Sequence, residues 1–597
     1  MKSYANLFRR FKGRVQYWEM LNEPDLPRGR KNPPQYPEYA KLAKATGELL
    51  RQIDPNALFM SAGFCQLMGR GRPELPDFHQ GAMKECWQVF DVHCFHGHGH
   101  FQNYADNVID RNILPKRKEL GITIPWYANE TALTSASCSE KEQAEALFKK
   151  LLFSWGRGAI GYTWYNLREK GELRPNGEFQ YGMLTHDFYP KPVYAAYNAL
   201  TGIYQDKDYL STFDLPKGQW GFAFKSASEI AVCLWNHSLP ETVIMQSDAT
   251  SVESVDIFGN RKPLEISNGI IAVQNVLEPV NYLFKNASFV RTLPSPVSFK
   301  MPELILPEEE ATFSISLNNP FAVEKKASAK LRFPENITVS QSVFEGTVPS
   351  NGHLDFTAKI RLDNSADVAK SCWLFAETNL EGFPPFRQFG KIPVPTMVTA
   401  SLDGKPCMLM NDAKTLTELL HGDPAHEHHL WKGAKDLSAS FWLDVKDGAL
   451  VVKVVAEDDV HLQPEGDVAA NRIWQGDSVQ MFITPMDADT PFQLEYARQQ
   501  DGSPYVFMRT SPNGFKPDTS KLKLETTRKE TQTTYVITVP PDALGVSQDF
   551  FSKPFRFNIM VNDNDDNIRE SWMAMAPGIG NGVIVLQHPV ILFVKNN

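Results

Sequence analysis

The first third of the chain alternates short apolar runs with segments whose apolar residues recur every three to four positions. An apolar run bounded by turn residues predicts a strand, and the longer spacing predicts an amphipathic helix. One such helix, at 34–53, places Tyr39, Leu42 and Leu50 on one face. The predicted strands are 15–22, 57–63, 88–95, 122–129 and 159–165. Strands that alternate with helices indicate an α/β domain with a parallel sheet, which we expect over residues 1–204.

From about residue 205 the helical spacing disappears, and short runs of alternating apolar and polar residues replace it. Alternation with a period of two predicts strands that have one buried face. The Pro-punctuated stretch 291–395 is typical of an immunoglobulin-like sandwich, and we expect further β-sandwiches before and after it. The sequence therefore predicts a multidomain protein, α/β followed by all-β, divided into 1–204, 205–290, 291–395 and 396–597.

Length and composition are those of a globular protein with several domains: 597 residues, of which 42% are hydrophobic and 22% charged. A net charge of −9 argues against nucleic acid as a partner. No apolar run is long enough to cross a bilayer, so no membrane partner is expected. The seven cysteines form no C-x-x-C pair, which favours reduced and mostly buried thiols. The N-terminal stretch has no apolar segment of the signal-peptide type, which leaves the location open.

Two glutamates stand where predicted strands end. Glu23 ends the first strand within an Asn-Glu-Pro tripeptide, and Glu130 ends the fourth. Hydrolysis of a glycosidic bond needs one carboxylic acid that protonates the leaving oxygen and one carboxylate that attacks the anomeric carbon or activates water. In a parallel barrel the active site lies at the carboxyl ends of the strands, so both glutamates are candidates. The structural alternative is that each residue only introduces the helix that follows. Glu19, four residues deeper in the strand, is expected to be structural.

These segments resemble a known family. Trp18–Asp25 is similar to the fourth-strand motif of clan A glycoside hydrolases, in which Asn-Glu-Pro places the acid/base glutamate. The strand that ends in Glu130 resembles their seventh, which carries the nucleophile, and Gly161–Tyr165 resembles their eighth. Family 39 is the nearest by these motifs, family 5 is similar, and the resemblance covers roughly residues 4–290. It implies a partial (β/α)8 TIM barrel that holds strands four to eight, followed by β-sandwich domains.

The resemblance also implies an activity. It is that of a retaining glycoside hydrolase, which cleaves O-glycosidic bonds of poly- or oligosaccharides by double displacement, with Glu23 as acid/base and Glu130 as nucleophile. Four substrate-binding residues are implied in this domain, namely Asn22, His93, His96 and Trp164. The asparagine would contact the sugar 2-OH or hold the nucleophile, and a histidine at the end of the sixth strand would contact the nucleophile or a hydroxyl. The tryptophan would form the floor of the −1 subsite, unless it is plain barrel core. Such a substrate points to an extracellular or periplasmic protein.

Glu23 lies unusually early in the sequence for a residue that ends the fourth strand of a barrel. An eight-stranded barrel takes about 250 residues, yet only about 14 residues precede the strand that ends in Glu23. Met1 could be an internal methionine of a longer protein, a second chain could complete the barrel, or the barrel could be a remnant without activity. The alternative to an enzyme is thus a non-catalytic carbohydrate-binding protein with a vestigial or incomplete barrel.

A histidine-rich run from His93 to His100 raises the question of a metal, because imidazoles are good ligands for zinc. No cysteine or acidic residue recurs at ligand spacing around it. A barrel-mouth loop with sugar-contacting histidines is therefore favoured, and no metal is expected there. Four further histidines in a polar loop are expected to be solvated: His421, His426, His428 and His429.

The C-terminal unit resembles family 9 carbohydrate-binding modules, in the stretches 437–443, 450–459, 473–480 and 561–572. In that family two tryptophans sandwich a terminal sugar, and Trp474 and Trp572 fall in comparable motifs. The alternative is that Trp474 is buried in the sandwich. Asp563 and Asp565 are candidates for a structural Ca²⁺, although a β-turn explains them equally well. No other cofactor is expected.

Overall fold

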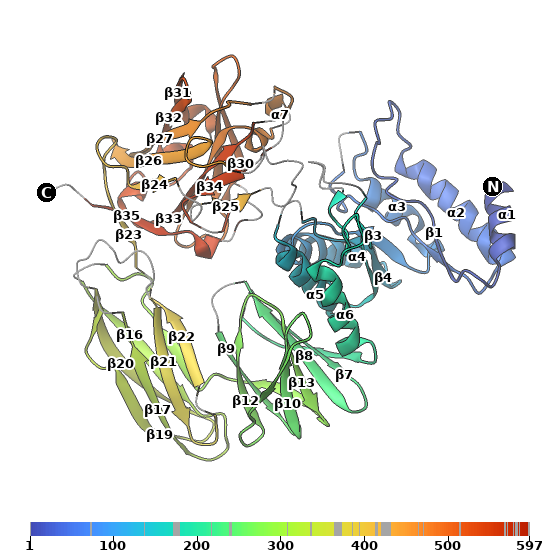
Figure 1. Ribbon diagram of the computed structural model, residues 1–597, viewed down its shortest axis with the longest axis horizontal. Coiled ribbons are helices and arrows are strands. Elements are labelled where there is room, and N and C mark those ends of the chain that lie inside the picture. The colour runs from blue at the N-terminus through green and yellow to red at the C-terminus, as the bar shows by residue number, and fades with distance from the viewer. Residues whose placement is uncertain are drawn as a thin grey trace.

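The structure is a computed structural model, which is mostly β-sheet with few helices (Figure 1). The described residues are 2–594 except 72–73, 136–137, 171–178, 217, 238–240, 307–308, 335–336, 363–372, 385, 393, 412–415, 420–430, 464, 470, 513–514, 517, 566–568, 570, 577, 580–582 and 584. The polar-loop histidines at positions 421–429 lie outside them.

The N-terminal part is built on five short parallel strands. Strand β1 pairs with β2, strand β3 pairs with β4, and β4 pairs with β5. Parallel bridges from Met60 to Val92 and from Phe64 to Phe95 connect the two groups, so the strands are neighbours in chain order. They are β1 (Tyr17–Glu19), β2 (Leu58–Met60), β3 (His93–His96), β4 (Trp126–Thr131) and β5 (Ala159–Trp164).

Helices connect these strands and cover one side of the sheet. Helix α2 realises the helix expected at 34–53, and its residues Tyr39, Ala43 and Leu50 are buried in the core as the apolar spacing requires. Helix α5 begins at Ser139, whose hydroxyl accepts a hydrogen bond from the backbone N–H of Glu142. The elements are α1 (Lys2–Phe11), α2 (Tyr36–Ile53), α3 (Phe78–Cys86), the π-helix η2 (Asn103–Ile113), α4 (Leu114–Glu119), α5 (Glu140–Gly156) and α6 (Pro192–Tyr204).

The two edge strands of this sheet are not covered on all sides by the described chain. Trp18 packs its ring edge-on against Phe8 of α1, with ring centroids 4.9 Å apart. Its neighbour Tyr17 faces the other way and is 48% exposed, and Ile160 in β5 is 55% exposed. Within the described residues, β1 and β5 each pair with one strand, so each has an open edge.

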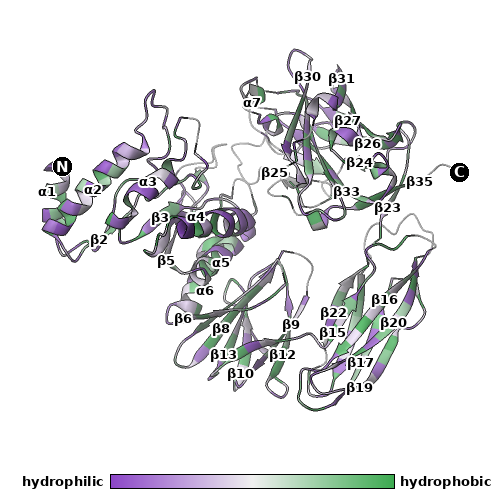
Figure 2. Ribbon diagram, turned by 180° about the vertical axis from the view of Figure 1, so that it is seen from behind, coloured by the Kyte–Doolittle hydropathy of each residue, from purple (hydrophilic) through white to green (hydrophobic). Residues whose placement is uncertain are grey.

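Two antiparallel β-sandwiches follow, and the first packs directly on the α/β part. Phe222 and Trp235 belong to the same hydrophobic core as α5 and α6, which joins the first sandwich to the parallel sheet (Figure 1). In Figure 2 the sandwich strands carry interleaved green and purple segments, because alternate residues face the core and the solvent.

The strands of the first sandwich are β6 (Asp208–Thr212), β7 (Gln219–Lys225), β8 (Glu229–Asn236), β9 (Glu241–Ser247), β10 (Ser251–Val255), β11 (Arg261–Leu264), β12 (Ile270–Asn275), β13 (Val280–Lys285) and β14 (Val290–Leu293). Those of the second are β15 (Val297–Lys300), β16 (Glu310–Asn318), β17 (Lys325–Arg332), β18 (Ile337–Val339), β19 (Val343–Val348), β20 (His353–Leu362), β21 (Trp373–Leu380) and β22 (Phe386–Lys391).

The C-terminal part is a third β unit with two sheets around one core. The larger sheet has the order β23-β35-β33-β28-β29-β30, with β34 on β33 and β25 on β34, and the smaller one has the order β24-β26-β27-β32-β31. The strands are β23 (Thr396–Thr399), β24 (Met408–Met410), β25 (Leu416–Leu419), β26 (Leu437–Lys446), β27 (Ala449–Asp458), β28 (Ser478–Thr484), β29 (Phe492–Arg498), β30 (Pro504–Thr510), β31 (Lys523–Lys529), β32 (Gln532–Val539), β33 (Phe555–Asp563), β34 (Ser571–Ala574) and β35 (Val590–Val594). Buried residues alternate along β26 and β32 of the smaller sheet, as the sequence pattern predicts, whereas β28 and β33 of the larger sheet are buried on both faces.

Among the described residues, no helix has the length and apolar character needed to cross a membrane. The side chains of Cys86, Cys94 and Cys233 are buried.

Candidate functional site

The loop after β1 holds Glu23 in an unusual backbone conformation. Glu23 has φ +47°, in the left-handed region, and its N–H donates to the carbonyl of Gly63 at 3.0 Å. Two positions on, the fully buried carboxylate of Asp25 accepts hydrogen bonds from the backbone N–H groups of Cys65 (3.0 Å) and Gln66 (2.7 Å). The loops after β1 and β2 are therefore tied together, and this tie fixes the direction of the Glu23 side chain.

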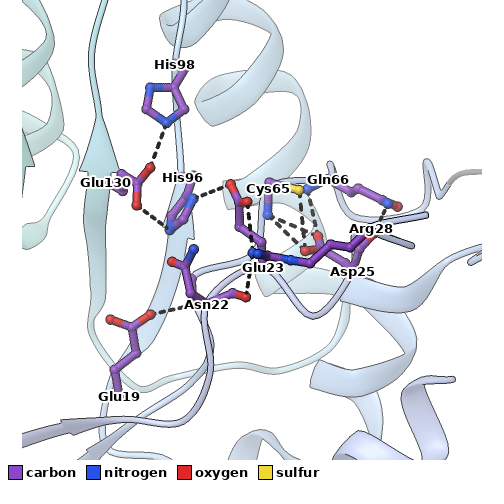
Figure 3. Close-up of polar contacts among 11 residues, drawn as sticks. Glu19, Asn22, Glu23, Asp25, Arg28, Cys65, Gln66, His96, His98 and Glu130 are labelled. Atoms are coloured by element: carbon purple, nitrogen blue, oxygen red, sulfur yellow. Dashed lines mark hydrogen bonds and ion pairs between the residues drawn. The ribbon is translucent and has the colours of Figure 1, made fainter. Parts of the chain in front are cut away.

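His96 lies between the two glutamates and contacts both (Figure 3). Its Nδ1 is 2.9 Å from Oε1 of Glu23, and its Nε2 is 3.7 Å from Oε2 of Glu130. The His96 side chain is only 1% exposed. Gly63 makes room for it, because a Cβ at that position would lie 2.2 Å from Nε2 of His96. The two carboxylates that the sequence singled out come from the ends of β1 and β4, which β2 and β3 separate in the sheet, and His96 of β3 links them.

The environment of Glu130 favours its ionised form. Burial raises the pKa of Glu130, but the hydrogen bond from His98 and the electrostatic influence of His96, His98 and Lys170 outweigh burial and lower the pKa below its ordinary value. The contact to His98 joins its Nε2 to Oε1 of Glu130 at 3.2 Å. The sequence grouped His98 with a histidine-rich loop, and only the structure shows that it touches Glu130.

Two further charged residues surround the pair. Arg28 lies 3.4 Å from Oε2 of Glu23 through a guanidinium nitrogen, and its side chain is half exposed. Glu19 accepts a hydrogen bond from the N–H of Gly63 at 3.0 Å. Burial among its neighbours raises the pKa of Glu19, although the Gly63 and Asn129 hydrogen bonds act in the opposite direction. Glu19 was expected to be structural, and the structure places it beside the site as a third carboxylate.

Asn22 and Trp164 are two other predicted site residues of this domain. Asn22 is exposed next to Glu23, and its carbonyl accepts a hydrogen bond from Arg28 at 3.2 Å. Trp164 ends β5 opposite Thr131, is buried, and donates from Nε1 to the carbonyl of Tyr181 at 3.1 Å. The rings nearest His98 are instead Tyr165 and Tyr181, with centroids 5.9 and 5.1 Å away.

The structure does not bring His93 to the pair. His93 is fully buried, with Nε2 2.8 Å from Nε2 of His79 and Nδ1 2.8 Å from a guanidinium nitrogen of Arg117. Burial lowers the pKa of His93 well below its usual value, and the neighbouring His79 and Arg117 lower it further. His93 is three residues from His96 on an extended strand, so the two rings point to opposite sides of the sheet. Of the two histidines proposed, His96 alone reaches the carboxylates.

A buried lysine holds the segments that carry these groups. Lys150 of α5 is fully buried, and its Nζ donates to the carbonyls of Gly97 (2.9 Å) and Ala132 (3.0 Å). Gly97 separates His96 from His98, and Ala132 lies two residues after Glu130. Burial lowers the pKa of Lys150 to about 7. The sequence offered no signal for this role, because Lys150 lies within an ordinary helical pattern.

In the C-terminal unit the two predicted tryptophans contact one arginine. The guanidinium carbon of Arg569 lies 4.8 Å from the Trp474 ring centroid and 3.9 Å from that of Trp572. Trp572 in β34 is 4% exposed, and Trp474, in the 3₁₀ turn Ile473–Gln475, is partly exposed. Residues that are 98 positions apart in sequence thus meet at one place.

Polar side chains lie along the larger sheet beside these rings, and Gln480, Glu495 and Asn562 among them are buried. Gln480 donates to the carboxylate of Glu495 at 2.8 Å, and Arg509 donates to the same carboxylate at 2.8 Å. Asn562, which is opposite Trp572 in register, accepts a hydrogen bond from Arg569 at 3.3 Å. Tryptophan faces beside a row of amide, carboxylate and guanidinium groups are suited to the C–H faces and hydroxyls of a sugar.

A buried group of carboxylates lies at the ends of β27 and β33, beside the start of β28. Burial raises the pKa of Asp458 to about 8 and those of Asp477 and Asp563 well above their ordinary value, and their mutual repulsion adds to it. Arg528 donates to Asp458 at 3.1 Å. Oδ1 of Asp563 is buried and has no hydrogen-bond partner within the described part of the chain. One oxygen each from Asp458, Asp563 and Asp565 lie within 4.8 Å of one another, a set that fits a hard cation such as Ca²⁺.

One part of the chain matches a known protein family, and solved structures resemble about half of it. Residues 418–581 match the family described as "Carbohydrate family 9 binding domain-like". None of the curated proteins matches the chain. Solved structures with a similar fold include a family 39 glycoside hydrolase from Bacteroides cellulosilyticus WH2, with a TM-score of 0.39 and 19% identity over 48% of this chain. The chain spans 61% of the length of that structure.

Two further similar structures are glycoside hydrolases. A family 44 endoglucanase from Clostridium thermocellum has a TM-score of 0.32 and 10% identity, and a family 51 α-L-arabinofuranosidase from Bifidobacterium longum has a TM-score of 0.32 and 9% identity. Each similarity covers 45% of this chain and 66% of the other. The match of residues 418–581 indicates that the C-terminal unit resembles carbohydrate-binding domains.

Proposed function

We propose that the chain carries the catalytic pair of a retaining glycoside hydrolase, with Glu130 as nucleophile and Glu23 as acid/base. One observation carries the proposal: His96 contacts both carboxylates at the carboxyl ends of parallel strands, at 2.9 and 3.7 Å. The lowered pKa of Glu130 supports the assignment of roles, because the nucleophile must be ionised. The family resemblance of both strand ends supports it further.

In the first step the Glu130 carboxylate attacks the anomeric carbon and the bond to the leaving oxygen breaks. Glu23 gives its proton to that oxygen, and a glycosyl ester of Glu130 remains. In the second step Glu23 takes a proton from water, the water oxygen attacks the anomeric carbon, and the ester bond breaks to restore Glu130. His96 contacts both side chains, at 2.9 and 3.7 Å, so one buried ring holds the two carboxylates in position.

The proposal assigns the sugar-binding surfaces as follows. Asn22, exposed beside Glu23, contacts a hydroxyl of the bound sugar, and Trp164 with the nearby Tyr165 and Tyr181 forms the wall behind it. In the C-terminal unit Trp474 and Trp572 clamp a pyranose ring, and the Arg569 side chain shifts when the ring enters. The match of residues 418–581 to a carbohydrate-binding family supports this second surface.

The test of the catalytic proposal is hydrolysis of a panel of 4-nitrophenyl α- and β-glycosides and of plant and microbial polysaccharides. Glu130→Ala should abolish turnover, and added azide should restore it with inverted configuration, because the small anion enters the space of the missing carboxylate. Retention by the wild type is read by NMR of the first-formed anomer. Glu119→Gln, an exposed glutamate that pairs with Lys116 on α4, is the matched control. Wild-type turnover that survives both Glu23→Ala and Glu130→Ala would refute the proposal.

A second candidate is a non-catalytic carbohydrate-binding protein. The open edges of β1 and β5 and the exposed Tyr17 and Ile160 favour it, because a glycosidase pocket needs walls on all sides. A second chain that covers these edges would reconcile the two candidates, and light scattering of the purified protein would detect it. Calorimetric binding of oligosaccharides that persists in Glu23→Ala/Glu130→Ala, without turnover by the wild type, would favour binding alone.

We also propose that a Ca²⁺ ion binds the carboxylates of Asp458, Asp563 and Asp565 in the C-terminal unit. The three aspartates would hold the ion through their oxygens, and the ion would neutralise charges that burial otherwise disfavours.

We further propose an extracellular or periplasmic location for the protein. This location follows from the proposed polysaccharide substrate, and fractionation of the source cells tests it.

A further inference from the structure

The residues around Glu130 are also a set of metal ligands. His96, His98 and Glu130 each offer one ligand atom, and these atoms lie within 4.8 Å of one another. We propose that the three residues bind a divalent transition-metal ion such as Zn²⁺, and that the bound ion withdraws Glu130 from glycoside cleavage. The metal site stands on its own geometry, and only its inhibitory effect rests on the proposed function.

The distances suit a tetrahedral ion. Zinc binds imidazole nitrogen and carboxylate oxygen at about 2.0–2.2 Å, so two ligand atoms of a tetrahedral site lie about 3.3 Å apart. Nε2 of His98 is 3.2 Å from one Glu130 oxygen, and Nε2 of His96 is 3.7 Å from the other. Small side-chain rotations would bring the three atoms onto one ion. Two imidazoles and one glutamate form a known type of zinc site, with a fourth position open to water.

Glu23 prepares His96 for this role. A metal-binding histidine almost always gives its other ring N–H to a carboxylate or carbonyl, which fixes the tautomer and the ring orientation. Nδ1 of His96 lies 2.9 Å from Oε1 of Glu23, so the ring donates there and its Nε2 carries the lone pair. That Nε2 is buried and has no hydrogen-bond partner among the described residues. The buried nitrogen therefore points toward Glu130 with an unused lone pair.

The backbone presents the two histidines together. His96 and His98 are separated by one residue, which places both rings on the same side of an extended segment. The residue between them is glycine, and a Cβ at Gly97 would lie 2.3 Å from the ring of Tyr104. The side chains of Glu130 and His98 are 22% and 28% exposed, which gives an ion access from solvent. The histidine spacing alone did not favour a metal, because the acidic ligand comes from the neighbouring strand.

The ligand types separate this site from the carboxylate cluster of the C-terminal unit. Imidazole nitrogens suit zinc, copper and nickel, whereas Ca²⁺ and Mg²⁺ prefer oxygen ligands. The cluster around Asp458 and Asp563 is dominated by carboxylates and should take Ca²⁺. Excess Ca²⁺ in the buffer therefore fills that cluster and leaves the histidine site for a transition metal.

The experiment is a titration of the full, tag-free chain with Co²⁺ in Ca²⁺-containing buffer, followed by displacement with Zn²⁺. We expect one equivalent of Co²⁺ with the intense visible bands of a four- or five-coordinate site. His98→Ala and Glu130→Gln should each weaken binding at least tenfold, and Glu23→Gln about tenfold through loss of the outer contact. His96→Ala is avoided because this buried ring supports the fold. The matched control is His100→Ala, which removes an exposed contact to Glu142 and should leave binding unchanged.

Equal Co²⁺ affinity in the wild type and His98→Ala, or no visible bands in the folded wild type, would overturn the metal site. Inhibition is measured separately, as Zn²⁺ inhibition of aryl-glycoside hydrolysis reversed by a chelator. A wild type that binds Co²⁺ but hydrolyses no glycoside would disprove the proposed function and leave the metal site intact. Glycoside hydrolysis that Zn²⁺ does not inhibit, together with an absence of Co²⁺ bands, would disprove the metal site and leave the proposed function intact.

Discussion

Nε2 of His98 lies 3.2 Å from Oε1 of Glu130, on the side of that carboxylate away from Glu23. With His96 on the other oxygen, Glu130 is held between two imidazoles (Figure 3). The hydrogen bond from His98 stabilises the charged form of the Glu130 carboxylate.

His98→Ala should move the acidic limb of the kcat/KM profile to higher pH. The variant loses the hydrogen bond that lowers the pKa of Glu130, so protonation of the nucleophile begins at a higher pH. The pH dependence of aryl-glycoside hydrolysis measures it. His100→Ala serves as the control, since this neighbouring histidine contacts Glu142 rather than Glu130. An unchanged limb in His98→Ala would mean that another group sets it.

Glu23→Ala should slow cleavage in proportion to the basicity of the leaving group. General acid catalysis contributes about 10²- to 10⁴-fold, and we expect a loss of this size for alkyl glycosides and a far smaller loss for 2,4-dinitrophenyl glycosides. The reason is that a good leaving group departs without a proton. Steady-state rates across a series of aryl glycosides check it, and a uniform loss across the series would contradict the acid/base role.

Asp25→Ala should destabilise the α/β part and lower kcat. The backbone N–H groups of Cys65 and Gln66 donate to Oδ2 of Asp25 at 3.0 and 2.7 Å, and an alanine side chain cannot accept them. Leaving such buried donors unpaired costs about 1–3 kcal/mol. Denaturant unfolding followed by tryptophan fluorescence measures the stability. The exposed Asp187→Ala is the control, and equal stability of the two variants would show that Asp25 does not hold the Glu23 loop.

Lys150 should make the stability of the α/β part depend on pH. Burial lowers its pKa from the usual 10.5 to about 7 in the folded protein. Between these values the unfolded chain binds more protons, so stability rises with pH from about 7 to 10.5 and is lost as the pH falls through 7, with a slope of at most about 1.4 kcal/mol per unit. Lys150→Met keeps the volume and should flatten this slope. Calorimetric unfolding at several pH values compares the two proteins, and parallel curves would exclude Lys150 as the cause.

Chelation should destabilise the C-terminal unit. If Ca²⁺ joins the carboxylates of Asp458, Asp563 and Asp565, binding at 100 times Kd adds about 2.7 kcal/mol to the free energy of unfolding. We expect EDTA to lower the melting temperature of this unit by several degrees. In Asp563→Asn the response to EDTA should be much smaller, whereas the exposed Asp501→Asn should behave as the wild type does. A melting temperature that changes neither with EDTA nor with added Ca²⁺ would contradict the proposed Ca²⁺ site.

Much of the fold followed from the hydrophobic pattern. The helix expected at 34–53 appears as α2 at Tyr36–Ile53, and the strand expected at 159–165 appears as β5, Ala159–Trp164. The prediction of a strand at 88–95 was less accurate. The structure has a 3₁₀ turn at Trp87–Val89 and a strand only at His93–His96. Local spacing identifies an element, whereas its ends depend on contacts with other parts of the chain.

The sequence by itself determined that Glu23 and Glu130 end strands, because the apolar period stops at each of them. Only the tertiary structure decided which histidine reaches them. His93 and His96 share a strand but face opposite sides, and the direction of a side chain has meaning only when the neighbouring strands are in place. In the same way the meeting of Trp474 with Trp572, and of Asp458 with Asp563, depends on strand pairing over about a hundred residues. Such pairings are fixed by the packing of the whole core, which no local pattern records.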